Sequence, residues 1–218
     1  ERVLIESGAS LNASAMTSGS GGTIVAWSDI SNPQSLTAVA GTLQAKGGQQ
    51  FGDGGKIETS GRMLVTDGIR VNASAARGKA GEWLLDPYDI TISAATSANS
   101  GSAPNFTATS TGAIVKSADI ETSLNGGTNV SITTGSSGSE PGNITIAQNT
   151  IIQKQSGTTD VTLSLGAANN IVLDGGVSIT STSGKLNLVL RADSDAANGG
   201  KVSLNGTSST SKVTINTN

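Results

Sequence analysis

Along most of the chain, apolar residues recur at every second position in short bursts, and Gly, Ser, Asn or Asp separate the bursts. This alternation has the period of a β-strand with one buried face, and its apolar positions favour β-branched residues. We therefore expect an all-β protein built from many short strands. The core-facing residues of the predicted strands are Ile24 and Ala26; Leu43 and Ala45; Ile69, Val71 and Ala73; Ile90 and Ile92; Val130 and Ile132; Ile144 and Ile146; Val161, Leu163 and Leu165; Ile171 and Leu173; Val177 and Ile179; Leu186, Leu188 and Leu190; Val202 and Leu204; Val213 and Ile215.

One short helical insertion is predicted near residues 117–125. Ser117 can cap the first turn, and Gly126 can end the helix. Ile120 and Leu124 are four positions apart and share a face, which we expect to lie against the sheet.

The pattern alone leaves two ways of connecting the strands open. Three Gly-containing turns between apolar bursts favour hairpins and hence an antiparallel sandwich, namely Asp67-Gly68, Asp174-Gly175 and Asn205-Gly206. Against this, similar strands return after about 25 residues between Val161 and Val213, and periods of about 20 to 50 residues are typical of a solenoid.

The composition suits a solenoid. Charged residues are 13% of the 218 residues, aromatic residues are 2%, and Gly, Ser, Thr and Asn together make up nearly half. In a β-solenoid, aliphatic side chains of successive coils stack inside, and small polar residues form the corners. With about 20 residues per coil, we expect about ten coils and a rod about 50 Å long.

Several function classes are excluded by missing residues. The chain has no His and no Cys, which rules out a Ser-His-Asp triad, a Cys nucleophile, a disulfide and the usual zinc or haem ligands. We expect no cofactor and no metal. No apolar run approaches the roughly 18 residues of a membrane span. The net charge is −3 and the 13 Lys and Arg are scattered, so we expect no nucleic-acid partner.

The order of several motifs resembles a known family. The N-terminal motifs, at residues 21–29, 40–48, 52–61 and 78–92, occur in the order found in filamentous-haemagglutinin and high-molecular-weight adhesin type two-partner-secretion exoproteins. The later motifs lie at residues 117–132, 168–173 and 188–195, and the resemblance covers roughly residues 20–204.

This resemblance implies a right-handed parallel β-helix in which residues 1–218 form a single segment of a longer exoprotein. It implies export through an outer-membrane β-barrel transporter and a secreted, extracellular location on the surface of a Gram-negative bacterium. The implied function is that of a shaft or binding segment that mediates attachment to host cells, other bacteria or matrix glycans. The secretion domain of the family is missing, since Asn32-Pro33-Gln34 does not match its motifs, so we expect that this segment does not direct its own secretion.

A polysaccharide hydrolase or lyase on a β-helix is the alternative. Glu82, Asp86 and Asp89 form the densest acidic group, and Trp83 and Tyr88 beside them are candidate glycan contacts. A glycosidase pair must stand roughly 5–5.5 Å or 6.5–9.5 Å apart, which a sequence does not show. The same stretch is also explained by turn chemistry, with the aromatic rings covering the wall of the helix. We expect no catalytic site.

Two weaker features complete the candidates. The loop at residues 193–200 has oxygen ligands at alternate positions but departs from the EF-hand template, so we expect a solvated turn. Six Asn-x-Ser/Thr sites are candidates for glycosylation, in about the number expected from composition: Asn12, Asn72, Asn105, Asn129, Asn143 and Asn205.

Overall fold

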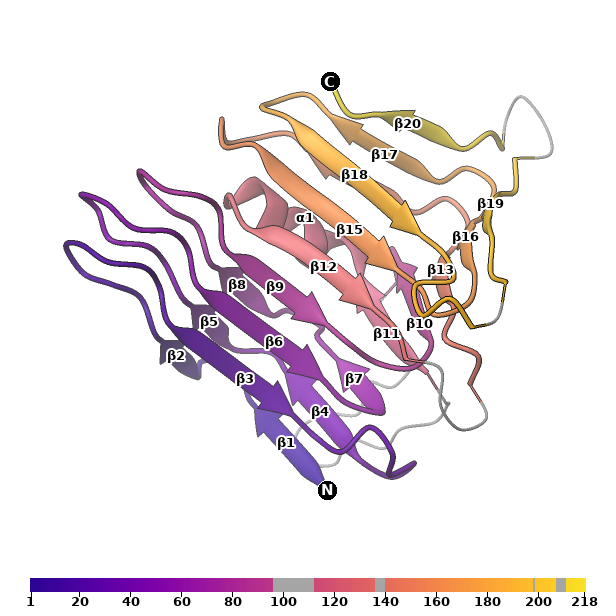
Figure 1. The fold of residues 1–218 in the computed structure, drawn as a ribbon, viewed down its shortest axis with the longest axis horizontal. Helices are drawn as coiled ribbons and strands as arrows, with labels where there is room; N and C mark the ends of the chain where they lie inside the picture. Colours follow the sequence, from indigo (N-terminus) through magenta and orange to yellow (C-terminus); the bar gives the residue numbers. More distant parts are fainter. Residues whose placement is uncertain (96–111, 136–139, 198, 207–210) are drawn as a thin grey trace.

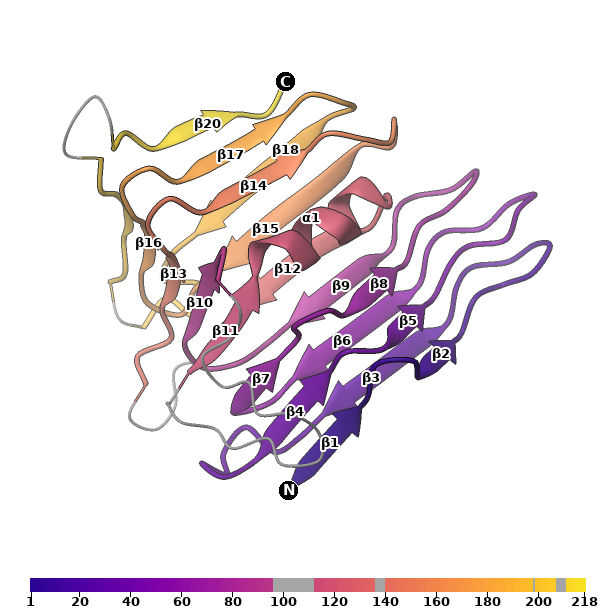
Figure 2. The ribbon, with the colours of Figure 1, turned by 180° about the vertical axis from the view of Figure 1, so that it is seen from behind.

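Successive strands of the chain lie on three faces in turn, and each strand pairs with strands of the coils above and below it (Figures 1 and 2). The computed structural model describes residues 1–95, 112–135, 140–197, 199–206 and 211–218. Every ladder between the described strands is parallel. The chain is therefore a parallel β-helix, and its coils wind in a right-handed sense (Figure 1).

The first face is an eight-stranded sheet with the order β1 (Arg2–Ile5), β4 (Leu36–Val39), β7 (Met63–Val65), β11 (Ala113–Lys116), β10 (Ile90–Ser93), β13 (Ile144–Ile146), β16 (Ile171–Leu173) and β19 (Val202–Leu204). The second face has six strands, β3 (Thr23–Trp27), β6 (Lys56–Ser60), β9 (Glu82–Leu85), β12 (Asn129–Thr133), β15 (Val161–Gly166) and β18 (Leu186–Arg191). The third face is split into β2 (Ser10–Asn12), β5 (Thr42–Gln44) and β8 (Arg70–Asn72) below, and β14 (Ile151–Lys154), β17 (Ser178–Ser181) and β20 (Thr214–Asn216) above.

Aliphatic side chains stack in columns inside the helix, as the alternation predicts. On the second face one inward column runs through Ile24, Ile57, Trp83, Val130, Leu163 and Leu188. Most of these side chains are buried within one hydrophobic core, which extends from the first coil to the sixth. Stacking like on like in this way removes apolar surface from water at every rung, which is the main stabilising term of the fold.

The fourth coil departs from the regular order. Both β10 and the next strand, β11, lie on the first face and pair with each other. β11 also pairs with β7 below it, whereas β10 also pairs with β13 above it. The first face therefore has two strands from this coil, in reversed spatial order. The helix α1 (Ser117–Asn125) then occupies the third face, between β8 and β14 (Figure 2).

Side chains of α1 replace the strand that the third face lacks at this level. The Glu121 carboxylate accepts the N–H of Gln153 (2.7 Å), and the Asn125 Oδ1 accepts the N–H groups of Gln155 (2.9 Å) and Ser156 (2.8 Å). These bonds satisfy the lower edge of β14, which would otherwise present unpaired donors.

The helix prediction is confirmed in its bounds, but the predicted N-terminal cap is wrong. The helix ends at Asn125, and Ile120 and Leu124 are fully buried. Ser117 does not cap it: Lys116 occupies the N-cap position, no side chain bonds the first turn, and Ser117 is the first helical residue.

The antiparallel alternative is ruled out for the described strands. The Asp-Gly turns at 67–68 and 174–175 connect strands of different faces instead of forming antiparallel hairpins, with positive φ at Gly68 (83°) and at Gly176 (79°), which follows the second turn. The coils are also longer and fewer than expected. Strands of the second face begin at residues 23, 56, 82, 129, 161 and 186, so one coil takes between 25 and 47 residues.

Asp and Asn side chains at the corners tie each coil to the next. In each case a carboxylate or amide oxygen accepts a backbone N–H from the coil above, at 2.8–3.2 Å. These bonds join Asp53 to Lys79, Asn129 to Thr162, Asp160 to Lys185, Asn143 to Asn170 and Asn170 to Lys201. The richness of the sequence in corner residues is therefore explained largely by the fold.

Candidate functional site

Three long loops leave the corner between the third and second faces and stack into one flat arm (Figure 1). The loops are residues 13–22, 45–55 and 73–81, which we call the first, second and third arm loops. Backbone bonds join them at equivalent positions, for example from the N–H of Ala15 to Lys46 O (2.9 Å) and from the N–H of Gly47 to Ser74 O (2.9 Å). The arm is thus a continuation of the parallel ladder beyond the body of the helix.

Glycine allows the loops of the arm to pack backbone against backbone. A Cβ atom at Gly54 would lie 1.8 Å from Ala73 O, and one at Gly55 would lie 2.0 Å from Gly22 O. At these positions the loops have no room for a side chain, so the Gly-rich stretch around residues 47–55 is a packing requirement of the arm.

The ladder stops above the third arm loop because the fourth coil has no arm. Its corner is the short turn 126–128, where the Thr128 hydroxyl accepts the N–H of Ala73 (2.8 Å). On the returning leg, Asn129 Nδ2 donates to Ala80 O (3.1 Å). Side chains of the fourth coil therefore cap the base of the third arm loop, and no loop of the described residues lies above its outer part.

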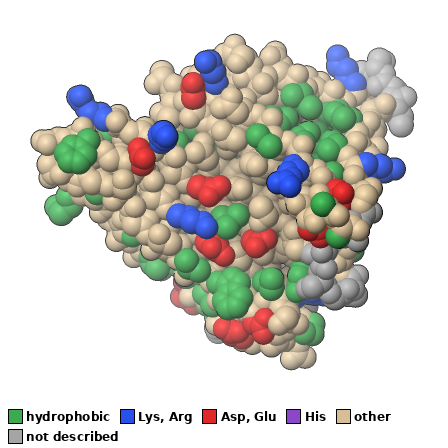
Figure 3. Space-filling model, viewed as in Figure 1, with side chains coloured by type: hydrophobic (Ala, Val, Ile, Leu, Met, Phe, Trp, Pro, Cys, Tyr) green, Lys and Arg blue, Asp and Glu red, His purple; other side chains and the backbone are tan. Residues whose placement is uncertain are grey.

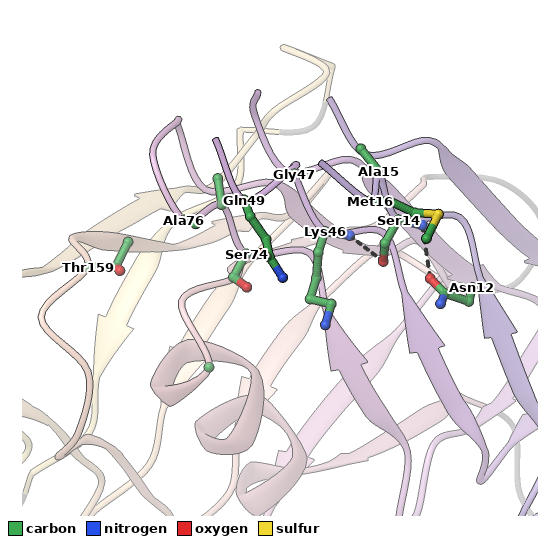
Figure 4. Close-up of a pocket in the computed structure, with 12 residues that line it drawn as sticks. Asn12, Ser14, Ala15, Met16, Lys46, Gly47, Gln49, Ser74, Ala76 and Thr159 are labelled. Carbon is green, nitrogen blue, oxygen red and sulfur yellow. Dashed lines mark hydrogen bonds between the residues drawn. The ribbon is translucent and has the colours of Figure 1, made fainter. Parts of the chain in front are cut away.

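Two grooves lie beside this upper edge. The first, of about 560 Å³, is lined by the outgoing legs of the arm loops together with Gly126 and Thr159. The second, of about 570 Å³, is lined by Gly78–Ala80, Asn129, Thr158–Asp160 and Thr162. Figure 4 shows that Lys46 and Gln49 point into the first groove, near the C-terminal end of α1. Its lining is otherwise hydroxyl, amide, Ala and Gly, with the thioether of Met16 at one side.

The acidic group expected from the sequence is not brought together. Glu82 and Asp86 lie on the outer side of the second face. They are four residues apart along the extended chain, so their Cα atoms are separated by about 13 Å. Asp89 is at the next corner, where its Oδ1 accepts the N–H groups of Gly142 (2.8 Å) and Asn143 (2.6 Å). In Figure 3 acidic side chains gather near the centre of the second face. None of the three residues lines either groove.

The two aromatic glycan candidates are inside the protein. Trp83 is fully buried, and its Nε1–H donates to the hydroxyl of Thr59 (3.0 Å). Tyr88 is 5% exposed and lies beneath the guanidinium of Arg62, 4.7 Å from the ring centroid. Neither ring offers a face to a sugar in this structure. The indole that the second face exposes is Trp27, which the sequence did not single out.

The candidate glycosylation sites fall at corners and strand ends. Asn12 and Asn205 are exposed, whereas Asn72, Asn129 and Asn143 are half-buried. The amide Nδ2 is the atom that N-glycosylation modifies; at Asn129 it donates to Ala80 O, and at Asn205 it donates to Asp174 (3.2 Å). Asn105 lies outside the described residues.

The loop at 193–200 is built as a turn. Asp193 has a positive φ of 53°, and its Oδ1 accepts the N–H of Gly199 (3.1 Å), while Asp195 Oδ1 accepts the N–H of Ala197 (3.2 Å). Within the residues that the structure describes, no group of three acidic side chains is arranged to hold a metal ion.

Sequence analysis did not find the buried charges. Lys154 is fully buried, and its ammonium donates to three backbone carbonyls. Arg62 and Glu140 form a buried ion pair with 2.8 Å between Nη2 and Oε1. In the sequence both cations are isolated residues in polar corners. The one available signal is the apolar Ile152 two positions before Lys154, which places the lysine on the inward side of its strand.

Comparisons with known proteins do not extend this description: no protein-family model matches the chain, and no curated protein matches it. Among the described residues, no helix is long and apolar enough to cross a membrane.

Proposed function

We propose that this chain is a shaft or binding segment of a secreted surface adhesin of a Gram-negative bacterium, of the filamentous-haemagglutinin and high-molecular-weight adhesin type. In this proposal the longer exoprotein leaves the cell through an outer-membrane β-barrel transporter. It then attaches to host cells, other bacteria or matrix glycans at the cell surface. The segment acts by spacing and by multivalent contact, without catalysis.

The observation that carries the proposal is a continuous parallel β-helix with rows of polar side chains on part of its outer surface. On the second face, Asn129, Thr162 and Asn187 form one outward column, and Ser131 and Ser164 lie side by side in the next. These hydroxyl and amide groups repeat at about 4.8 Å, one per rung. Such groups make individually weak hydrogen bonds to glycans, and repetition along a fibre multiplies them.

The enzyme alternative has less support. Its three carboxylates are spread over the second face and a corner, and Asp89 already accepts two backbone N–H groups. A hydrolase requires an acid and a base on either side of one bond, and neither groove is lined by these residues.

An adhesion assay tests the proposal. Beads carrying many copies of residues 1–218 are expected to bind epithelial cells or extracellular matrix, while a single soluble copy competes poorly. Replacing Ser131 and Ser164 by Glu places two charges on adjacent outer rungs of the second face and is expected to reduce bead binding several-fold. The matched control places Glu at Thr145 and Val172, which are adjacent outward positions of the first face.

Two outcomes would overturn the proposal. The first is bead binding no greater than that of albumin-coated beads on every cell and matrix surface. The second is turnover of a neutral or uronic-acid polysaccharide by the soluble chain that Asp86→Asn abolishes, which would establish the enzyme alternative.

A further inference from the structure

A notch one strand high separates the third arm loop from the corner loop 155–160 of the fifth coil. At its back, Gly127 lies between Ser74 below and Thr159 above: a Cβ atom at Gly127 would be 3.5 Å from Ser74 Cβ and 3.5 Å from Thr159 Oγ1. The two loops belong to coils two rungs apart, or about 10 Å. Both grooves include Thr159 in their lining; the first lies along the outgoing legs of the arm loops and the second along the returning leg of the third arm loop.

The floor of the notch presents backbone donors that continue an existing ladder. The N–H groups of Ala15 and Gly47 donate upward to Lys46 O and Ser74 O, and Ala75 is the third member of this series. Among the described residues no acceptor lies opposite the N–H of Ala75. On the returning leg Gly21 and Gly54 donate upward in the same way, and the next N–H, that of Ala80, has no acceptor in the described chain either.

The first groove has a positive charge and no negative one. Lys46 is the charged residue of its lining, and no Asp or Glu belongs to it. No ion pair to Lys46 occurs in the part of the chain that the structure describes. Ala75, Ala76 and Gly126 beside it are small, so a backbone can approach the open donor closely.

We propose that the notch binds an extended segment of a partner protein that carries an acidic side chain. The segment adds one strand above the outgoing leg of the third arm loop, a carbonyl oxygen of its backbone accepts the N–H of Ala75, and its carboxylate lies against Lys46. Addition of a strand to an open edge is a recurring mode of peptide recognition. The single-strand height and the interrupted backbone ladder favour a polypeptide over a saccharide, because an extended backbone places a carbonyl at the rung where the N–H of Ala75 is open.

The test uses residues 1–218 and a synthetic seven-residue peptide of alternating Thr and Val with Glu at its centre. Binding is followed by NMR, with amide hydrogen exchange as the second readout. We expect saturable binding that slows exchange of the Ala75 amide, while the Ala80 amide, which opens on the second groove, is unaffected. The same peptide with Pro on both sides of Glu is expected not to bind, because Pro removes backbone donors and disfavours strand pairing.

Charge reversal identifies the ionic contact. Lys46→Glu is expected to weaken binding of the Glu peptide about tenfold, equivalent to about 1.4 kcal/mol, and to improve binding of a Lys-centred peptide. The matched control is Lys201→Glu, an exposed lysine outside the lining of both grooves.

Three results would overturn the inference: no binding of the Glu peptide at millimolar concentration, binding unchanged by Lys46→Glu, or binding without protection of the Ala75 amide. An oligoglucuronate that binds through Lys46 and leaves Ala75 exchange unchanged, when the peptide does not bind, would assign the groove to a saccharide instead. The inference does not depend on the adhesin proposal. The bead assay can fail while the peptide binds, and the peptide can fail to bind while the beads adhere.

Discussion

At the residue scale, Lys154 is a buried charge held by the backbone. Its Nζ donates to Ser156 O (2.9 Å), Gly157 O (2.7 Å) and Ser183 O (2.6 Å), which belong to the corners of two successive coils. Burial lowers the pKa of Lys154, and the nearby carboxylate of Asp160 acts in the opposite direction. The three carbonyls compensate the lost hydration of the ammonium, and the ammonium satisfies three carbonyls in return.

Replacing Lys154 by Met keeps most of the side-chain volume and removes the donor. We expect the free energy of unfolding to fall by about 1.5–3 kcal/mol, since three backbone carbonyls of two successive corners lose the charged donor that they share. Urea unfolding followed by circular dichroism measures the change. Lys201→Met, at an exposed position, is the control and should change stability by less than about 0.5 kcal/mol; an equally small effect at Lys154 would contradict the assigned role.

Asp119 makes stability depend on pH. Burial raises the pKa of Asp119 from 3.8 to about 6; the neighbouring Asp67 also raises it, while the N–H of Gly68 and the charge of Lys116 lower it. The folded state therefore holds a proton that the unfolded state releases between about pH 4 and pH 6. The free energy of unfolding contributed by this group is greatest below pH 4 and is lost as the pH rises through about 6.

Asp119→Asn removes this ionisation while keeping a side chain of the same shape. We expect the variant to be more stable than the parent at pH 7 to 8 and to show a flatter stability profile between pH 4 and pH 6. Thermal unfolding across this range provides the measurement, with Glu6→Gln, an exposed carboxylate, as the control. Parallel profiles of the parent and the Asp119→Asn variant would show that the carboxyl is not protonated in the folded protein.

At the scale of elements, the arm depends on glycine where its loops meet. Gly54→Ala would place a Cβ 1.8 Å from Ala73 O, so the second and third arm loops must separate. We expect a loss of at least about 2 kcal/mol or local unfolding of the arm. Amide exchange of the arm, measured together with global unfolding, distinguishes these results. Gly166→Ala is the control, because its nearest atom would be Thr133 Cγ2 at 3.7 Å; equal effects of the two substitutions would contradict the packing role of Gly54.

The alternation of apolar residues predicted which side chains are buried, but it did not predict how strands pair. Leu163 and Leu165 face inward as expected, because alternation depends only on the local pleat of a strand. Pairing depends on partners 23 or more residues away, and the turns at Gly68 and Gly176 have the same residues as hairpin turns. The reversed order of β10 and β11 has no local signal at all.

The grooves were not predicted, for a similar reason. The glycines of the arm and Lys46 are visible in the sequence, yet the notch arises because the fourth coil has a corner of three residues where its neighbours have longer ones. The reverse error occurred at Trp83: an aromatic ring beside carboxylates suggested a sugar site, whereas its inward register puts it in the core. One residue of register decides which side of a strand faces solvent.

At the scale of the molecule, the coils at the two ends of the helix leave inward side chains uncovered. In the last coil the inward-facing Val202, Leu204 and Ile215 are 37%, 53% and 42% exposed. In the first coil the inward-facing Leu11 is 38% exposed. The outermost strands at each end, β1, β2 and β3 below and β18, β19 and β20 above, also have one edge without a strand partner in the described structure.

We therefore expect residues 1–218, studied as an isolated polypeptide, to associate head to tail. The lower end of one copy can continue all three faces of another by parallel pairing, and this contact is heterologous, so it does not close. Sedimentation velocity should show a mass that rises with concentration. Leu204→Lys puts a charge into the uncovered column and is expected to reduce association, whereas Ile151→Lys, at an outward position that is 54% exposed, should leave it unchanged. A monomer at every concentration tested, or equal sensitivity to both lysines, would mean that the open ends do not recognise one another.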